Sequence, residues 1–426
     1  MAANRAQRDR RPGSVAAVSL PVKTIDDGEL RDWFDALSSA FFMTADAQEI
    51  ADFRRPSVDL TRTWAAYDGA RIVATLRTFG TEMTVPGGAQ LAADAVTSVG
   101  TMPTHRRRGA LTSMMTASLE AAAGRGDPIS ILIAARWPIY GRYGYGAAAE
   151  LAEYAIDTVI ADFGGLGREG HLEYVETTVG HALAPALFDR FRLAQSGAIR
   201  RDHTDFDRDF GKRTMPGRTP WVGRVVVHRP ARDAEIDGYV RYHVDDHWEG
   251  MLPRSVVVID DLVATTHPAY AALWKLCCDL DNVTTVKAAN RSVDEALPWM
   301  LTDARAVQQV RRSDILWLRV LDVETALSAR RYLASGSVVI EVDDDVTHAA
   351  GRYELQGGPD AASCTRTTKP ADIELTAKTL GSAYLGGMSL QTMAAAGLVI
   401  EHRAGAIAVA DAMFKWNSVP WCNTWF

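Results

Sequence analysis

Apolar and polar positions follow an ordered succession of helix-like and strand-like periods through the first third of the chain. Residues 25–42 place apolar side chains at helical spacing, and residues 107–126 do so again. Thr104 precedes the second of these helices as a candidate N-cap. Residues 129–134 form a short, mostly apolar run, which is typical of a strand buried on both faces. Strands are also predicted at residues 63–67, 71–78, 81–85 and 92–102.

The middle third of the chain repeats this succession. A strand predicted at residues 255–262 is followed by a turn and by a helix at residues 266–279. The turn, residues 264–268, contains neither an arginine nor a glycine. A duplicated domain that has lost a ligand site would show this pattern, so we expect a degenerate repeat. The other elements predicted here are a helix at residues 183–194 and strands at residues 222–227 and 239–243.

The last third mixes strands and helices in an α+β order and carries no obvious chemistry of its own. Before the middle third, residues 163–170 are rich in glycine and read as a linker. They contain Gly165-x-Gly167-x-x-Gly170, the spacing of dinucleotide-binding loops, but a strand-like segment follows where that motif needs a helix. The predicted parts are residues 1–19, 20–160, 161–303 and 304–426, the last with strands at residues 316–320, 338–342 and 373–376 and helices at 323–334, 379–385 and 389–396.

Composition narrows the class of protein. The chain is 47% hydrophobic and 23% charged, as in ordinary globular proteins, and it lacks a run of 18 apolar residues, so we expect no membrane span. A net charge of −7 disfavours a general nucleic-acid binder. Residues 1–19 are rich in arginine and lack the apolar core of a signal peptide, which predicts a disordered basic tail. The four cysteines make no disulfide framework and favour a cytoplasmic setting, with secretion lacking a standard signal peptide as the alternative.

The densest chemical signal is a strand end that leads into a basic turn and a helix. Val99, Gly100 and Thr101 close the strand predicted at residues 92–102. A helix N-terminus presents unpaired N–H groups and the positive end of the macrodipole, and arginine forks bind phosphate oxygens. The turn therefore predicts a phosphate-binding site, with a solvated basic helix start or a nucleic-acid contact as alternatives. Its residues are Arg106, Arg107, Arg108, Gly109 and Ala110.

Two further segments carry candidate functional groups. A glycine-rich turn shortly after the buried strand holds Tyr140, Tyr143 and Tyr145, whose hydroxyls are candidate proton donors, although packing of the turn explains them as well. The last eight residues, 419–426, contain two tryptophans, a proline and a terminal phenylalanine. Chain ends are usually polar and frayed, and these apolar side chains are costly to leave in water. We therefore expect this tail to dock on the protein.

These motifs resemble those of a known family. The basic turn resembles the pyrophosphate loop of GNAT acetyltransferases, with Arg106-x-x-Gly109 in place but Leu111 where the family prefers glycine or alanine. Together with the later run IYGRYGYG, residues 139–146, it resembles the enhanced intracellular survival (Eis) branch of that family. Further matches are LWLRVLDV at residues 316–323, YLGGMS at residues 384–389 and the terminal phenylalanine.

The resemblance implies an α/β and α+β architecture, in which two GNAT domains, the second degenerate, precede a domain like sterol carrier proteins. It implies an enzyme that transfers an acetyl group from acetyl-CoA to primary amines of polycationic small molecules such as aminoglycosides, or to lysine side chains. It also implies a homohexamer. Independently, the sequence shows no metal-ligand spacing that fits its predicted elements, so we expect no metal cofactor. The alternative is a ligand-binding protein whose CoA site is vestigial or regulatory; the complete arginine turn favours the enzyme.

The resemblance also implies roles for individual residues. The backbone at residues 99–101 would pair with the pantetheine arm, and the basic turn would hold the pyrophosphate. Tyr140 would be the general acid that protonates the leaving thiolate, with Tyr143 and Tyr145 as alternatives. The C-terminal carboxylate of Phe426 would be the general base. An α-carboxyl, with a pKa of ~3.5, is a weak base, so we expect it to act through water or by electrostatics.

One stretch departs from the family pattern. Members often carry Ser-Glu before the IYGR-like motif, whereas this chain has Ala135-Arg136-Trp137-Pro138. The bulky Trp137 would lie beside the acceptor pocket and alter its range. Trp33, Phe41 and Phe42 on the first helix are further candidates for pocket walls, although core packing explains them equally well.

Overall fold

The computed structural model of the protein describes residues 20–346 and 349–426, and the basic tail predicted at residues 1–19 lies outside them. The chain divides into two compact units. The first comprises Met1–Thr78 and Thr97–Ser118, and the second comprises Phe79–Val96 and Leu119–Phe426. The elements that pass from one unit into the other are the strands β3 (Arg71–Thr84) and β4 (Gln90–Thr101) and the helix α3 (Ala110–Gly124).

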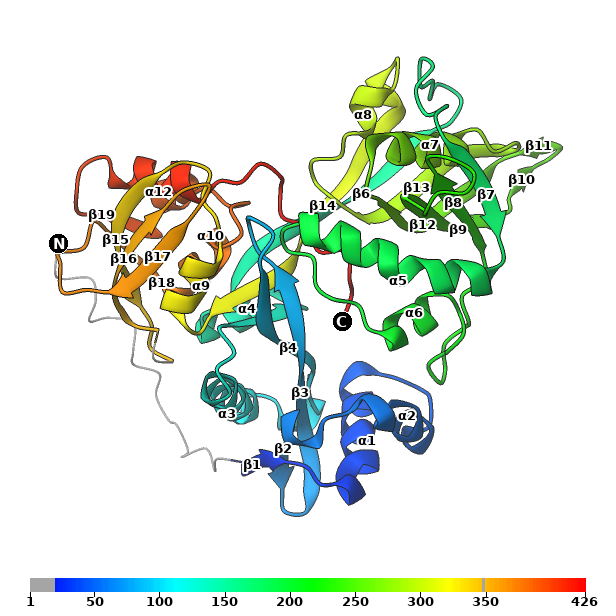
Figure 1. The fold of residues 1–426 in the computed structure, drawn as a ribbon. Helices are drawn as coiled ribbons and strands as arrows, with labels where there is room; N and C mark the ends of the chain where they lie inside the picture. The colour runs from blue at the N-terminus through cyan, green and yellow to red at the C-terminus, as the bar shows by residue number, and fades with distance from the viewer. Residues whose placement is uncertain (1–19, 347–348) are drawn as a thin grey trace. The chain divides into compact units, whose positions relative to one another are not determined.

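The first unit is a small antiparallel sheet with helices packed on it. The strand β2 (Thr63–Asp68) pairs with β1 (Val22–Thr24) on one side and with β3 on the other. Helix α1 (Leu30–Phe41) starts later than predicted, because Asp26 caps a separate 3-10 turn. It ends where Phe42 adopts a left-handed conformation with φ 57°. The helix α2 (Ala47–Arg54) follows, and Figure 1 shows it beside α1.

One long sheet runs through the second unit. Its strand order is β4-β5-β14-β6-β13-β12-β9-β8-β7, and the pair β12–β13 is parallel like the pair β4–β5. The sheet thus repeats a parallel pair with a helix between its strands, as expected for a duplicated domain. Its other strands are β5 (Ile129–Ile133), β6 (Gly146–Asp157), β7 (His171–Val175), β8 (Arg224–Arg229), β9 (Gly238–Asp245), β12 (Ser255–Ala264), β13 (Val283–Arg291) and β14 (Val307–Val320).

Two helices cover opposite faces of the later strands. Helix α5 (Thr177–Ala194) packs against Val225 and Val227, whereas α7 (His267–Cys278) packs in the cluster that contains Val226. Successive strand residues point to opposite faces, so the alternation fixes one helix on each side. Figure 1 shows α5 running in front of β8, β9 and β12. The smaller elements around them are α6 (His203–Asp209), α8 (Leu297–Met300) and the hairpin β10 (Trp248–Glu249) and β11 (Leu252–Pro253).

Strand β14 lies where the sequence did not predict it. Its end was expected as a strand of the last part, residues 304–426, but β14 inserts between β5 and β6 and pairs antiparallel with both. Its buried residues 315–320 are apolar apart from Arg319. This run therefore completes the long sheet, and the last part begins its own structure after it.

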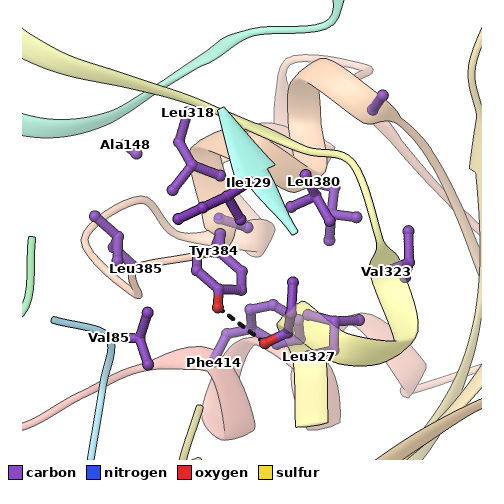
Figure 2. Close-up of a cluster of buried hydrophobic side chains, with 14 of the residues drawn as sticks. Val85, Ile129, Ala148, Leu318, Val323, Leu327, Leu380, Tyr384, Leu385 and Phe414 are labelled. Carbon is purple, nitrogen blue, oxygen red and sulfur yellow. Dashed lines mark hydrogen bonds between the residues drawn. The ribbon is translucent and has the colours of Figure 1, made fainter. Parts of the chain in front are cut away.

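The last part forms a separate five-stranded sheet that shares a core with the long one. Its order is β17-β16-β15-β18-β19. Figure 2 shows Ile129 of β5 and Leu318 of β14 packed with Tyr384 and Phe414, and the Tyr384 hydroxyl donates to the Ala326 carbonyl at 2.8 Å. The elements here are α9 (Val323–Ala329), β15 (Gly336–Asp343), β16 (Gly351–Gly357), β17 (Ala362–Arg366), β18 (Ile373–Thr376), α10 (Ala377–Ala383), α11 (Leu390–Ala395), β19 (Val399–Glu401) and α12 (Ala406–Phe414).

The structure agrees with the prediction for the glycine-rich linker and disagrees with the predicted N-cap of the helix after the basic turn. The glycine run at residues 163–170 is followed by the strand β7, not by a helix, so the dinucleotide spacing lies in a linker as predicted. Thr104, in contrast, does not cap α3. It lies in a 3-10 turn, where its hydroxyl bonds the neighbouring His105, and α3 begins only at Ala110.

Candidate active site

The end of β4 is irregular in a way that the sequence did not reveal. Ser98 has a φ of 54°, an uncommon conformation for a residue other than glycine, and its carbonyl accepts a hydrogen bond from the Thr75 hydroxyl at 3.0 Å. Gly100 is required by packing, because a Cβ there would lie 2.9 Å from the Ala40 Cβ of α1. The irregular conformation at Ser98 directly precedes Val99 to Thr101, the segment that the family resemblance implies for binding pantetheine.

The basic turn that follows is shaped by two left-handed residues. Arg107 has a φ of 64° and Gly109 a φ of 83°. The helix begins at the next residue, Ala110, which is buried and anchors the first turn of α3. A Cβ built on Gly109 would meet nothing within 4 Å, so the space in front of the turn is open within the described residues. The turn thus exposes backbone N–H groups at a helix N-terminus.

The three arginines of the turn have different surroundings. Arg108 donates to the Asp68 carboxylate at 3.0 Å, and His105 bonds the same carboxylate at 3.1 Å. These hydrogen bonds, first that of Arg108, lower the pKa of Asp68. Arg106 and Arg107 are exposed, and neither forms an ion pair with a described residue. Arg108 therefore braces the turn, and the other two guanidinium groups fit a phosphate ligand.

The tyrosine turn lies in the second unit. The short helix α4 (Trp137–Tyr140) is followed by a 3-10 turn, and Gly144 closes the turn with a φ of 77°. Tyr140 is 6% exposed, and its hydroxyl makes no hydrogen bond with the described residues. Burial raises the pKa of this hydroxyl to about 12. The Tyr140 hydroxyl is therefore protonated and does not donate its proton to any described residue.

Tyr145 differs from Tyr140 although both rings are buried and pack edge to face with centroids 6.3 Å apart. The Ser130 hydroxyl donates to the Asp94 carbonyl, so the 2.6 Å contact between the Ser130 and Tyr145 hydroxyls leaves Tyr145 as the donor. Its proton is therefore engaged in the core. Tyr143, the third candidate, is 3% exposed and its carbonyl accepts from Arg319.

The C-terminal tail is docked within the second unit. Figure 1 shows the red segment leaving α12 and reaching the end of α5, and the Trp421 N–H donates to the Ser196 carbonyl at 2.9 Å. Trp421 and Thr424 are 4% and 3% exposed. The Phe426 ring packs edge to face on Phe79, with centroids 5.7 Å apart. The final residue is therefore held by an aromatic contact and by buried residues before it.

Comparisons with known proteins decide the family. Models of the GNAT acetyltransferase domain match residues 21–148 and 197–320, and a sterol carrier protein domain model matches residues 323–423. An uncharacterized N-acetyltransferase of Streptomyces avermitilis is 39% identical, covering 96% of this chain and 99% of its own. The N-acetyltransferase Eis of Mycobacterium tuberculosis is 32% identical, covering 88% and 93%. The chain belongs to the Eis-like N-acetyltransferases.

Solved structures agree with this assignment. The crystal structure of Eis1 from Mycobacterium abscessus matches with a TM-score of 0.84 at 32% identity, covering 95% of this chain and all of that one. A GCN5-related N-acetyltransferase from Anabaena variabilis shares the fold, with a TM-score of 0.80 at 20% identity over 96% of this chain. The predicted fold class and enzyme class are confirmed: this Eis-like protein is an acetyltransferase of a family that uses acetyl-CoA.

The second GNAT domain of this Eis-like chain has a different turn at the corresponding place. Between β12 and α7, the Thr266 side chain caps the helix by accepting from the Ala269 N–H at 3.3 Å. The Thr266 hydroxyl also donates to the Asp237 carboxylate at 2.6 Å. A carboxylate at this helix N-terminus would repel a phosphate, and Pro268 removes one N–H. These features account physically for a degenerate donor site.

The predicted pocket residues of the Eis-like chain fall into two groups. Phe41, Phe42 and Trp137 are exposed by 51%, 79% and 56%. Trp137 packs against Trp317 with ring centroids 4.9 Å apart. Trp33 differs from the expectation of a pocket wall: it is fully buried, and its indole N–H donates to the Trp64 carbonyl at 2.9 Å. Core packing in the first unit therefore explains why a large aromatic residue stands on the apolar face of α1.

Two kinds of feature are absent from the described residues. In residues 20–346 and 349–426, no three or more histidine, cysteine, aspartate or glutamate side chains are arranged to hold a metal ion. No helix in the same residues is long and apolar enough to cross a membrane.

Sequence reasoning also missed Arg319 and Asp344, whose guanidinium and carboxylate meet at 2.8 Å behind the tyrosine turn. An arginine within an apolar strand was the available signal.

Proposed function

We propose that this Eis-like acetyltransferase acetylates primary amines of polycationic small molecules such as aminoglycosides, or lysine side chains. Tyr140 acts as general acid and the carboxylate of Phe426 as general base. The observation that carries the assignment of the acid is the contrast between two buried tyrosines. The Tyr140 hydroxyl makes no hydrogen bond with described residues, whereas the Tyr145 proton is engaged by Ser130.

Donor binding is proposed for the strand end and the basic turn. The exposed Arg106 and Arg107 would hold the pyrophosphate together with the N–H groups at Gly109 and Ala110. The backbone from Val99 to Thr101 would pair with the pantetheine arm. Arg108 belongs to this set as the residue that braces the turn through Asp68. Bound acetyl-CoA supplies the thioester that the amine attacks.

Tyr140 would serve the step in which the carbon–sulfur bond breaks. The departing thiolate takes the phenolic proton, so the thiol leaves neutral. A pKa of about 12 keeps Tyr140 protonated throughout the physiological range, which a general acid requires. Burial supports the role in a second way, because a site shielded from water strengthens a directed proton transfer. Tyr143 and Tyr145 remain the alternative acids in this proposal.

Phe426 would serve the other proton transfer. As the new nitrogen–carbon bond forms, the amine must release a proton, and the α-carboxylate would receive it through a water molecule. The support is positional: Phe79 packs on the Phe426 ring, and the preceding Thr424 is buried. A tail held this way loses little conformational entropy when it acts.

The acceptor class rests on the net charge of −7 and on the family. An acidic protein attracts cationic amines when its acidic groups lie near the site. Phe41 and Phe42 in the first unit and Trp137 in the second remain candidates for contacts with the acceptor, because each is an exposed aromatic side chain. A homohexamer is part of the same proposal and follows from the family resemblance.

The deciding experiment follows release of CoA from acetyl-CoA across aminoglycosides, polyamines, lysine-containing peptides and simple arylamines. Release that depends on aminoglycosides or polyamines supports a small polycationic acceptor, and release with peptides alone supports a lysine acceptor. Release with arylamines alone would overturn the proposed acceptor class while leaving the enzyme class intact. The Tyr140→Phe variant, run on the same panel, tests the general acid.

A further inference from the structure

The parallel strands β12 and β13 of the second GNAT domain separate before they end. Their pairing runs from Ser255 with Val283 to Ile259 with Ala288, although β12 continues to Ala264 and β13 to Arg291. Beyond the last pair, the facing edges carry backbone groups that this parallel ladder does not satisfy, and buried groups of this kind need partners. The separation creates an opening between the two strands.

Residues of the C-terminal tail supply partners at this opening. The Trp421 indole N–H donates to the Asn290 carbonyl of β13 at 3.0 Å. Asn423, 7% exposed, lines a small cavity together with Asp260 of β12 and Arg291 of β13. The Arg291 guanidinium lies over the Trp421 ring at 4.9 Å. The tail therefore bonds β13 directly and lines one cavity with residues of both separated strands.

A buried arginine fixes the tail backbone to β12. Arg201 is 8% exposed and donates to the Asp261 carboxylate of β12 at 2.6 Å. Its remaining nitrogens donate to the Asn423 carbonyl at 2.7 Å and to the Thr424 hydroxyl at 3.1 Å. Tyr239 also donates to Asp261, at 2.7 Å. The guanidinium also lies 3.9 Å from the Asp209 carboxylate and 4.2 Å from the centre of the Phe188 ring. Its two hydrogen bonds to the tail therefore come from a cation that the second domain already holds in place.

The segment after α5 also binds the tail. The Ser196 carbonyl accepts from the Trp421 N–H at 2.9 Å, and the Gln195 side chain donates to the Val419 carbonyl at 3.1 Å. Gly197, with a φ of 87°, lets the chain pass closely, because a Cβ there would lie 3.3 Å from the Trp421 nitrogen. Hydrogen bonds from Gln195 and to Ser196 therefore also hold the tail backbone.

We propose that the second GNAT domain is a peptide-binding module whose ligand is the tail segment Trp421–Thr424 of this chain. The tail occupies the opening between β12 and β13, in the strand pair that corresponds to β4 and β5 of the first domain. The degenerate turn at Thr266 has lost the phosphate site, and the opening beside it has gained an aromatic and polar peptide as occupant. This binding does not depend on the catalytic role proposed for Phe426.

The first test measures hydrogen exchange in the full-length protein. In the unmodified chain, the amides of residues 421–424 are expected to be protected. Arg201→Gln removes the guanidinium that binds Asn423 and Thr424, and exchange in this segment should rise by at least about tenfold. Arg352→Gln, which alters an exposed arginine paired with Glu341, is the matched control and should leave the tail unchanged. Unchanged tail protection in Arg201→Gln would overturn the proposal.

A second test keeps the proposal falsifiable if Arg201→Gln folds poorly. A protease site inserted between Ser418 and Val419 allows the tail to be cut after the full chain has folded. The released octapeptide, residues 419–426, should remain bound in a one-to-one ratio through gel filtration, and Trp421→Ala should weaken its retention at least about tenfold. A peptide that separates at once from the cut protein would overturn the proposal.

The same cut protein separates this inference from the proposed function. If the peptide stays bound but deleting Phe426 leaves turnover unchanged, the module is retained and the catalytic role of the carboxylate is lost. If deleting Phe426 abolishes turnover but residues 421–424 exchange freely, the reverse holds. Binding of the peptide and turnover are therefore independent readouts.

Discussion

The Arg319 guanidinium donates to the Tyr143 carbonyl at 2.6 Å from directly behind the tyrosine turn. The same guanidinium pairs with both oxygens of the Asp344 carboxylate at 2.8 Å, and both side chains are buried. A Cβ on Gly144 would lie 1.4 Å from the same guanidinium, so the turn can pass only because this residue is glycine. The conformation of the turn that carries Tyr140 is thus fixed by a buried ion pair between β14 and the loop after β15.

Asp344→Asn should reveal how strongly this pair holds the turn. The substitution leaves the Arg319 charge buried without a counter-charge, which destabilises proteins by about 3–5 kcal/mol. Urea unfolding measures that loss, and turnover should fall more than the affinity for acetyl-CoA because Tyr140 lies on the turn. Glu341→Gln alters an exposed pair with Arg352 and should change stability by less than about 1 kcal/mol. Equal effects of the two substitutions would contradict the account.

Tyr140→Phe should lower turnover roughly 100-fold, because it removes a proton donor and little packing. The affinity for acetyl-CoA, measured by calorimetry, should stay within about twofold. Tyr145→Phe is the matched control: it should cost about 1 kcal/mol of stability through the lost bond to Ser130 and leave turnover nearly unchanged. If Tyr145→Phe proved the more damaging to turnover, the assignment would pass to Tyr145.

The pH dependence of turnover tests the same residue. A general acid works in its protonated form, so its contribution is lost only as the pH rises through its pKa. Burial raises the pKa of Tyr140 to about 12, and the profile should therefore show no falling limb from this residue below about pH 10. The sign for stability is the same: the raised pKa stabilises the fold below the unfolded value, and this contribution fades as the pH rises towards 12. A fall in turnover near pH 8 that is lost in Tyr140→Phe would contradict the raised pKa of this residue.

Arg107→Ala should weaken acetyl-CoA binding by roughly 10- to 100-fold, since one charge-assisted hydrogen bond to phosphate is lost. Turnover at saturating acetyl-CoA should change little. Arg71→Ala, at an exposed position on β3 in the same unit, controls for loss of charge. Equal weakening by both would mean that general charge, and not the turn, sets the affinity.

Much of the fold followed from periodicity and local motifs. The buried strand at residues 129–134 and the helix at 266–279 appear as β5 and α7 with shifted ends. Helix α3 starts three residues late because Arg107 adopts a left-handed conformation before it. Such a conformation is set by the surrounding structure and has no signature in a run of arginines.

Long-range pairings were the part that the sequence could not give. The apolar run ending at residue 320 reads as a strand, but its partners β5 and β6 lie far earlier in the chain, and periodicity carries no information about partners. The same limit hid Arg201 and Asp261, which are 60 positions apart. Trp33 shows a related limit: an aromatic residue on an amphipathic helix does not reveal whether core or ligand covers it, and here the side chain is buried.

The insertion of β14 between β5 and β6 also governs the order in which this protein can mature on the ribosome. Domains usually fold as they emerge, N-terminal part first. Here β5 has one neighbour in β4 and another in β14, so its second side stays open until residue 320 has been synthesised. A nascent chain stopped before β14 exposes two bare strand edges, which favour aggregation. The catalytic sheet is therefore completed late in translation, and an isolated N-terminal domain should depend on chaperones that the whole chain does not need.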